Sequence, residues 1–135
     1  MARIRSSDTA PEVALRRALH AVGLRFRLHR KDLPGKPDIV LPRRNAVILV
    51  HGCFWHRHEG CSIATTPKSN TSFWADKFER NVARDARVRG KLEELGWRVF
   101  VAWECEVASR RRAMQTAGRI ARELGHEPPS PTPNN

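Results

Sequence analysis

The sequence is poor in several features that define other classes of protein, and each shortage narrows the possibilities. Three cysteines in 135 residues are too few for a small secreted domain that depends on disulfides. No apolar run is long enough to cross a membrane, residues 1–9 do not resemble a signal peptide, and no basic helix with a clean apolar face stands out. We therefore expect a cytoplasmic protein with no membrane partner.

Acidic residues are also scarce, and this shortage leaves the chain strongly basic. There are 14 Asp and Glu against 25 Lys and Arg, so the net charge is +11 and the sequence pI is about 11.1. Such an excess predicts attraction to a polyanion, and nucleic acid is the leading candidate. A general contribution to solubility is the alternative.

The length and the apolar content of 40% suit one domain with a single core. We expect this domain to cover 1–125. The segment 126–135 contains four prolines and is expected to be a disordered tail.

Hydrophobic periodicity predicts the element order α-β-β-β-α-β-α. The run 46–50 indicates a central strand buried on both faces, and the long helix after it favours a parallel crossover to 97–103. The fold class is therefore α/β, a mixed sheet flanked by helices. The expected helices cover 11–22, 73–95 and 109–124, and the expected strands cover 24–28 (half-buried), 38–41, 46–50 and 97–103.

The loop after the run 46–50 carries an unusual density of Cys and His. Cys53, His58 and Cys61 lie within it, and the remaining cysteine, Cys105, follows the last expected strand. Three thiolates and one imidazole suit tetrahedral zinc, and neighbouring parallel strands would bring the two segments together. We interpret the set as a closed, structural zinc site. The alternative is three buried free cysteines that act as small apolar side chains.

Asp38 opens the strand next to the one that leads to His51. A carboxylate at this position could hold a hard divalent cation against a substrate phosphate, as Mg²⁺ sites do with one or two carboxylates. An aspartate at a strand start is also a common turn residue, and this alternative stays open.

His51 and His56 lie on the Cys/His loop, and Asp85 lies on the long helix. An imidazole can take a proton from water near neutral pH, and a neighbouring carboxylate would orient it. Equally, His56 could be a further zinc ligand, and Asp85 could pair with the arginines around it on the helix surface.

Phe54 and Trp55 lie in the same polar loop, and Trp74 lies at the start of the long helix. We expect the first two rings to point in opposite directions, so that both cannot easily be buried. On a protein of this charge, exposed aromatic rings suggest base stacking or intercalation. The alternative is that all three are core residues.

Longer motifs connect these residues. They are Asp8-Thr9-x-Pro11-Glu12, Leu24-Arg25-Phe26-Arg27, Leu33-Pro34-Gly35-Lys36-Pro37-Asp38-Ile39-Val40, His51-Gly52-Cys53-Phe54-Trp55-His56, Phe73-Trp74, Asn81-Val82-x-Arg84-Asp85 and Trp103-Glu104-Cys105. Together they resemble the very short patch repair (Vsr-type) DNA mismatch endonucleases over most of residues 1–107.

This resemblance implies a fold similar to that of type II restriction endonucleases. It also implies a Mg²⁺-dependent, strand-specific nick beside the thymine of a T:G mismatch in double-stranded DNA. Such mismatches arise when 5-methylcytosine is deaminated, so a cytosine-5 DNA methyltransferase is the implied functional partner. The implied enzyme is a monomer associated with the nucleoid.

The resemblance implies roles for individual residues as well. Asp38 corresponds to the metal-binding aspartate, the backbone carbonyl of Val50 to a second Mg²⁺ ligand, and Glu12 to an acid near the same centre. His56 corresponds to the general base, and its neighbours in the site are His51 and Asp85. The implied zinc ligands are Cys53, His58, Cys61 and Cys105, and the implied intercalating residues are Phe54, Trp55 and Trp74.

Two departures from related proteins are visible. The related restriction nucleases carry Glu/Asp-x-Lys where this chain has Val50-His51-Gly52, a departure that the repair family shares. An N-terminal arm that clamps the minor groove, common in relatives, is not expected here. The alternatives are a nuclease of the same fold with another DNA target and a zinc-stabilised DNA-binding module without catalysis. No role is assigned to the basic helix after Val107.

Overall fold

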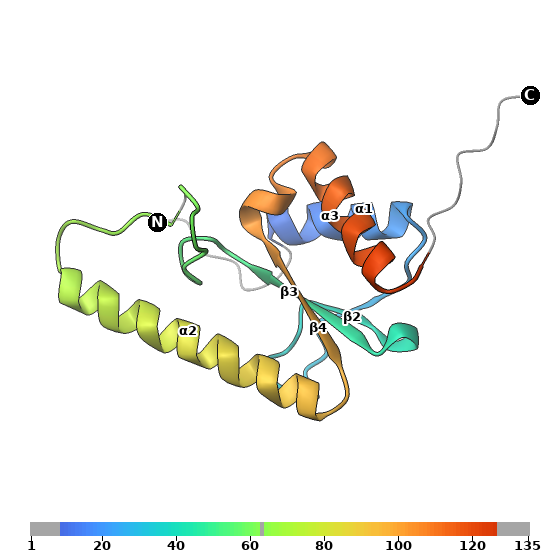
Figure 1. Ribbon diagram of the computed structural model, residues 1–135, viewed down its shortest axis with the longest axis horizontal. Helices are drawn as coiled ribbons and strands as arrows, with labels where there is room; N and C mark the ends of the chain where they lie inside the picture. The colour runs from blue at the N-terminus through green and yellow to red at the C-terminus, as the bar shows by residue number, and fades with distance from the viewer. Residues whose placement is uncertain (1–8, 63, 127–135) are drawn as a thin grey trace, which may run out of the picture.

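The computed structural model describes residues 9–62 and 64–126, in which four strands form one sheet with helices on both faces (Figure 1). The helices are α1 (Ala10–Ala21), α2 (Thr71–Glu94) and α3 (Arg110–Glu123), and the 3₁₀ turns are η1 (Pro42–Arg44) and η2 (Glu104–Val107). The strands are β1 (Arg27–Leu28), β2 (Ile39–Leu41), β3 (Ala46–His51) and β4 (Arg98–Trp103). The predicted element order and the mixed sheet are confirmed.

β3 lies inside the sheet, antiparallel to β2 and parallel to β4. Its side chains alternate between two apolar layers. Ala46 and Ile48 pack in the layer that α1 and α3 cover, whereas Val47 and Leu49 pack with Leu92 of α2 on the other face. The prediction of a strand buried on both faces is confirmed, because helices cover both sides of the sheet (Figure 1).

The parallel pairing of β3 and β4 determines what lies at one edge of the sheet. α2 forms the crossover between them, as expected for parallel strands. The register pairs His51 with Trp103, so both strands end at the same level. The Cys/His loop after β3 and the turn η2 after β4 therefore begin side by side.

The strand expected over 24–28 is wrong in its extent, because only Arg27 and Leu28 pair with β2. The N–H of Leu24 donates instead to the carbonyl of Leu19 at 3.0 Å and closes the end of α1, where Gly23 adopts a φ of 90°. Leu28 is 38% exposed, so the expected half-burial does not extend to the end of this run.

α3 is a basic helix with an apolar face, which the sequence did not suggest. Ala113, Ala117 and Ile120 on this face are buried in the same core layer as α1. The apolar face is therefore covered by the fold itself. Within the described ranges, no helix combines the length and the apolar character needed to span a bilayer.

The folded part extends one residue further than expected. His126 Nδ1 lies 2.8 Å from Nη2 of Arg44, and His126 Nε2 lies 3.0 Å from the carbonyl oxygen of Val22. The backbone N–H of His126 donates to the carbonyl of Ala121. His126, the first residue of the expected tail, is thus hydrogen-bonded to the domain, and 127–135 lie outside the described residues.

Candidate functional site

A cleft of about 600 Å³ opens beside β3, between the loop that precedes β2 and the helix α2. His51, His56 and Asp85 line it together. His56 Nδ1 lies 2.6 Å from Asp85 Oδ2, and the ring of His51 stacks on that of His56 with centroids 4.0 Å apart. Of the two interpretations left open above, the structure supports the imidazole–carboxylate pair.

His51 differs from His56 in its burial. It is 9% exposed, and burial together with the adjacent His56 ring lowers the pKa of His51 to about 4. The His51 ring is therefore neutral at pH 7. It covers one face of His56 and leaves Asp85 as the charged group that orients that ring.

One face of α2 holds Asp85 in place. Trp74, Phe78, Asn81 and Asp85 follow one another on it at spacings of four, three and four residues. Phe78 is buried, and the Asn81 amide donates to the carbonyl of Trp55 at 3.3 Å. This face therefore lies against the loop after β3 and brings Asp85 to His56.

Asp38 lies in the same cleft and belongs to a second cluster, which we call the carboxylate cluster (Glu12, His29 and Asp38). The three potential ligand atoms all lie within 4.8 Å of one another. Glu12, in the first turn of α1, is 2% exposed, and its Oε2 lies 3.1 Å from His29 Nε2. A hard divalent cation could bind to this set.

The Asp38 side chain also bonds to the neighbouring strand. Its Oδ2 accepts the N–H of Val50 at 2.8 Å. Burial, reinforced by the adjacent Glu12 carboxyl, nevertheless raises the pKa of Asp38 to about 6. Two carboxyl groups this close and this buried favour either a shared proton or a bound cation.

The four expected zinc ligands meet at the shared end of β3 and β4, and we call this set the sulfur cluster (Cys53, His58, Cys61 and Cys105). Their ligand atoms all lie within 4.8 Å of one another. His58 Nδ1 lies 3.6 Å from Cys53 Sγ and 3.4 Å from Cys105 Sγ, and the His58 ring stacks on Trp103. This donor set could hold a metal ion, and its composition suits zinc.

The sulfur cluster is joined by backbone bonds as well. The Cys105 N–H donates to Cys53 Sγ at 3.4 Å, and the Cys53 N–H donates to Glu104 Oε1 at 3.2 Å. Burial raises the pKa of Cys53 to about 12 and also raises the pKa of Cys105. Without a cation these thiols would keep their protons at pH 7, whereas a bound metal would favour the thiolates.

The predicted DNA-contacting aromatics form one cluster. The rings of Phe54 and Trp55 meet edge to face with centroids 5.0 Å apart, and both contact Trp74. The expectation that Phe54 and Trp55 point in opposite directions is wrong, because Phe54 packs on the buried ring of Phe78 at 5.2 Å and Trp55 packs beside it. All three are half-buried, and Lys77 Nζ lies 5.1 Å from the Trp55 ring.

Two residues of the site were not anticipated. His29 completes the carboxylate cluster, although nothing in its basic, alternating surroundings distinguishes it in the sequence. Arg57 holds the Cys/His loop: its guanidinium lies 4.1 Å from the Phe78 ring and donates to the carbonyls of Phe54, Ala64 and Thr65. In a chain so rich in arginine, no pattern marks one of them as a loop-forming residue.

These groups define a class of site. The carboxylate cluster could hold a divalent cation, and the His56–Asp85 pair could remove a proton from water in the same cleft. Both operations are those of metal-dependent hydrolases, of which nucleases are one kind.

Comparison with known proteins indicates which kind of hydrolase this chain is. A family model described as DNA mismatch endonuclease Vsr matches residues 1–62. The chain is 56% identical over 108 residues to the type II nicking enzyme V.XorIIP of Xanthomonas oryzae pv. oryzae. These aligned residues cover 80% of this chain and 79% of that protein. It is 43% identical over 117 residues to DNA mismatch endonuclease Vsr of Escherichia coli (87% and 74% covered).

A third relative is the type II nicking enzyme V.NmeAIP of Neisseria meningitidis, 41% identical over 124 residues that cover 92% of this chain and 88% of that protein. The chain therefore belongs to the Vsr family of DNA mismatch endonucleases, and it is an endonuclease. The resemblance inferred from the sequence motifs is confirmed.

Proposed function

We propose that this protein makes a Mg²⁺-dependent nick beside the thymine of a T:G mismatch in double-stranded DNA. Family membership supports an endonuclease that acts on mismatched DNA. One observation carries the proposed chemistry: the His56–Asp85 pair, 2.6 Å between Nδ1 and Oδ2, lies in the same cleft as Asp38.

His56 is the general base of this proposal. When its Nδ1–H donates to Asp85, Nε2 is left with a lone pair and can accept a proton from the attacking water. Asp85 fixes this tautomer and stabilises the imidazolium that forms. His51, neutral at pH 7 and stacked on His56, keeps the ring in position without competing for the proton.

Asp38 is the proposed Mg²⁺ ligand, with the backbone carbonyl of Val50 as a second ligand and Glu12 beside it. The donor chemistry fits, because the buried carboxylate of Glu12 and the half-buried carboxylate of Asp38 lie within 4.8 Å of one another. When bound, Mg²⁺ would polarise the scissile phosphate and neutralise charge that develops on it.

The sulfur cluster is the proposed structural zinc site. Four protein ligands leave no open position, so zinc here would hold the chain and take no part in the reaction. It would fix the loop that carries both His56 and the aromatic residues. The wider fold is proposed to be similar to that of the restriction endonucleases.

Phe54, Trp55 and Trp74 are proposed to intercalate beside the mismatch. Their cluster adjoins a groove on α2 lined by the cationic side chains of Lys77, Arg80, Arg84 and Arg87. These charges could contact backbone phosphates while the rings contact the bases. The net charge of +11 supports the same partner.

The biological setting follows from the proposed substrate. T:G mismatches form where 5-methylcytosine is deaminated, so the functional partner is a cytosine-5 DNA methyltransferase. We propose that the enzyme acts as a monomer on DNA in the cytoplasm, at the nucleoid.

The test is a nicking assay on end-labelled duplexes that contain a T:G mismatch or a matched pair, with Mg²⁺ or with EDTA. We expect one nick, in the thymine strand of the mismatched duplex only, and none in EDTA. Asp85→Asn should slow it by roughly 10²–10⁴-fold. The matched control is Asp76→Asn, also on α2, whose carboxylate is exposed and pairs with Arg80.

The alternative functions give different results in this assay. Equal cutting of matched and mismatched duplexes would indicate a nuclease with another target. Mismatch binding without any nick would indicate a non-catalytic DNA-binding module.

A further inference from the structure

We propose that His29 is a third protein ligand in the cation site of Glu12 and Asp38, and that its nitrogen makes the site prefer a first-row transition ion such as Mn²⁺ over Mg²⁺. The inference rests on the proposed function in one respect, namely that Asp38 holds the catalytic cation. It adds a ligand and an ion preference that neither the family nor the sequence motifs assign.

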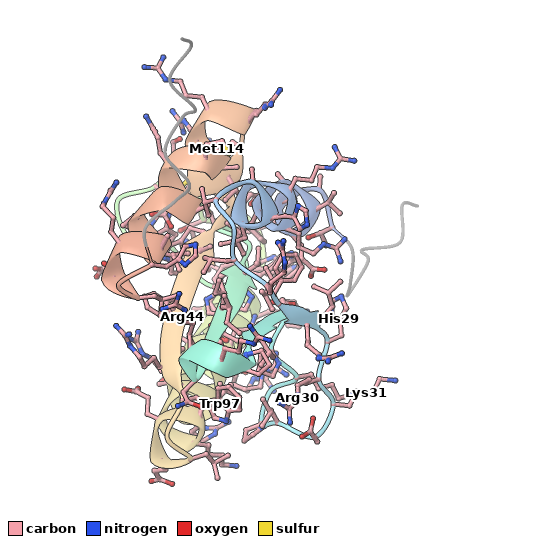
Figure 2. All side chains as sticks on the ribbon, turned by 90° about the vertical axis from the view of Figure 1, so that its right-hand side faces the viewer. His29, Arg30, Lys31, Arg44, Trp97 and Met114 are labelled. Carbon is pink, nitrogen blue, oxygen red and sulfur yellow. The ribbon has the colours of Figure 1, made fainter. Side chains whose placement is uncertain are left out.

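The backbone places His29 opposite Asp38. His29 follows β1 directly, and its N–H donates to the carbonyl of Asp38 at 3.2 Å, so the β1–β2 pairing extends to these two residues. Figure 2 shows His29 at the end of β1, where the loop that carries Arg30 and Lys31 begins. His29 has a φ of 50°, which departs from the extended conformation of the strand before it.

The side chains meet at distances that suit a shared ion. His29 Nε2 lies 3.1 Å from Glu12 Oε2, and the ligand atoms of Glu12, His29 and Asp38 all lie within 4.8 Å of one another. Adjacent ligands of an octahedral ion, each about 2.1 Å from the metal, are about 3 Å apart, and opposite ligands are about 4.2 Å apart. The distance between His29 and Glu12 therefore matches that of adjacent ligands, and the 4.8 Å limit on the other pairs is within about 0.6 Å of the span of such a coordination sphere.

Burial keeps these groups together. Glu12 is 2% exposed, because it faces inward from the first turn of α1, where Thr9 caps the helix. A buried carboxylate is costly unless a proton or a cation balances it. The guanidinium of Arg16 balances part of this charge, because its Nη1 lies 3.7 Å from Glu12 Oε2, and a cation shared with Asp38 and His29 would balance more of it.

The nitrogen donor decides which cation fits best. Mg²⁺ binds oxygen ligands almost exclusively and keeps several waters, whereas imidazole is a good ligand for transition ions. Mn²⁺ accepts both carboxylate and imidazole. A site with His29 should therefore bind Mn²⁺ more tightly than an all-oxygen site would, with little gain for Mg²⁺.

A simple ion pair between His29 and Glu12 predicts the opposite behaviour. In that arrangement His29 is an imidazolium, which repels any cation nearby. Replacing it with a neutral side chain would then strengthen the binding of Mn²⁺ and Mg²⁺ alike and leave the ratio of their affinities unchanged.

The experiment measures Mn²⁺ binding to the zinc-loaded chain by EPR of the free ion, and Mg²⁺ binding by competition. We expect His29→Gln to lower the Mn²⁺ affinity at least about tenfold and to change the Mg²⁺ affinity by less than about threefold. The matched control is His20→Gln, at the exposed end of α1, which should change neither affinity.

Pulsed EPR of bound Mn²⁺ gives a readout that needs no variant. The wild-type chain should show coupling to a ¹⁴N nucleus that changes to ¹⁵N coupling when histidine is ¹⁵N-labelled, and His29→Gln should remove it. Absence of nitrogen coupling in the wild type, or an equal change in both affinities on substitution, would overturn the proposal.

Asp38→Asn separates this inference from the proposed function. This substitution should weaken the binding of both Mn²⁺ and Mg²⁺, because it removes a carboxylate that would ligate either ion. If it leaves both affinities unchanged, Asp38 is not a cation ligand and the proposed mechanism itself fails. If it weakens both while His29→Gln alters neither, the mechanism stands and only the role of His29 is wrong.

Discussion

The sulfur cluster and the carboxylate cluster each gather potential metal ligands, but they do so from different parts of the chain. The sulfur cluster takes three ligands from one short loop and the fourth from η2, directly after β4. The carboxylate cluster takes its three from α1, from the residue after β1 and from the residue before β2. The sulfur cluster therefore joins Cys53 to Cys105, 52 residues further along the chain, whereas the carboxylate cluster draws only on α1, β1 and β2, at the start of the chain.

Their protonation differs too. Burial raises the pKa of Cys53 to about 12, so this thiol keeps its proton at pH 7 when no metal is bound. Burial raises the pKa of Asp38 only to about 6, so this carboxyl is largely ionised at the same pH. Without a metal, the Cys53 thiol is thus uncharged at neutral pH, whereas the Asp38 carboxyl carries a charge that a bound cation would balance. Four variants test this contrast.

Cys105→Ser should have the largest effect. Structural zinc in small motifs contributes roughly 10–16 kcal/mol of apparent binding free energy, as much as or more than the whole stability of a typical domain. We expect elemental analysis to find one zinc per chain in the wild type and circular dichroism to show loss of folding in the variant. Ala108→Ser, exposed at the end of η2, is the control. A fully folded Cys105→Ser chain, or a wild type without zinc, would contradict a structural zinc site.

His56→Ala should reduce nicking by roughly 10²–10⁴-fold, because it removes the general base. Zinc content and unfolding should remain those of the wild type, even though His56 lies on the same loop as three residues of the sulfur cluster. Mismatch binding, measured by fluorescence anisotropy, should change only modestly, since phosphate contacts supply most of the affinity. His20→Gln serves as the control. Nicking near the wild-type rate would show that another group accepts the proton.

The double replacement of Trp55 and Trp74 by alanine should reduce the preference for mismatched over matched duplex. Opening a base step costs a few kcal/mol, least at a faulty pair, and stacking on an aromatic ring returns about 1–3 kcal/mol per base. We expect a loss of preference of about tenfold or more, with salt-sensitive binding retained. Leu95→Ala, exposed at the far end of α2, is the control. An unchanged preference would assign both rings to the core.

Asp38→Asn should stabilise the Mg²⁺-free, zinc-loaded chain at neutral pH. The pKa of Asp38 is raised from 3.8 to about 6, so the folded state binds this proton more tightly than the unfolded state does. The resulting stability is present below pH 4 and is lost as the pH rises through 6. Asn does not titrate, so the variant should gain on the order of 1–3 kcal/mol over the wild type above pH 6. Denaturant unfolding of both chains at several pH values measures this difference, and a gain over the wild type that is no larger at pH 7 than at pH 4 would refute it.

Much of this contrast was predictable from the sequence. The short spacing of Cys53, His58 and Cys61 predicted their proximity, and the parallel crossover predicted that Cys105 would join them. The membership of His29 in the carboxylate cluster was not predictable, because it depends on a two-residue strand and on a local change of backbone direction. The orientation of Phe54 and Trp55 depended on Phe78, which lies far along the chain and provides the surface on which they pack.

The length of α2 relates the aromatic residues to the catalytic ones. Its 24 residues span about 36 Å, whereas the six residues of β3 span about 20 Å, so the start of the helix extends past the sheet (Figure 1). Trp74 and Asp85 share a face only because eleven residues make close to three whole turns. The helix therefore determines both the distance between these two side chains and their relative direction around its axis. One inserted residue between them would turn Trp74 by about 100° away from Asp85, and seven would restore the angle but add about 10 Å to the separation. The distance and the angle between the proposed site of base contact and the proposed site of cleavage are therefore both set by one helix.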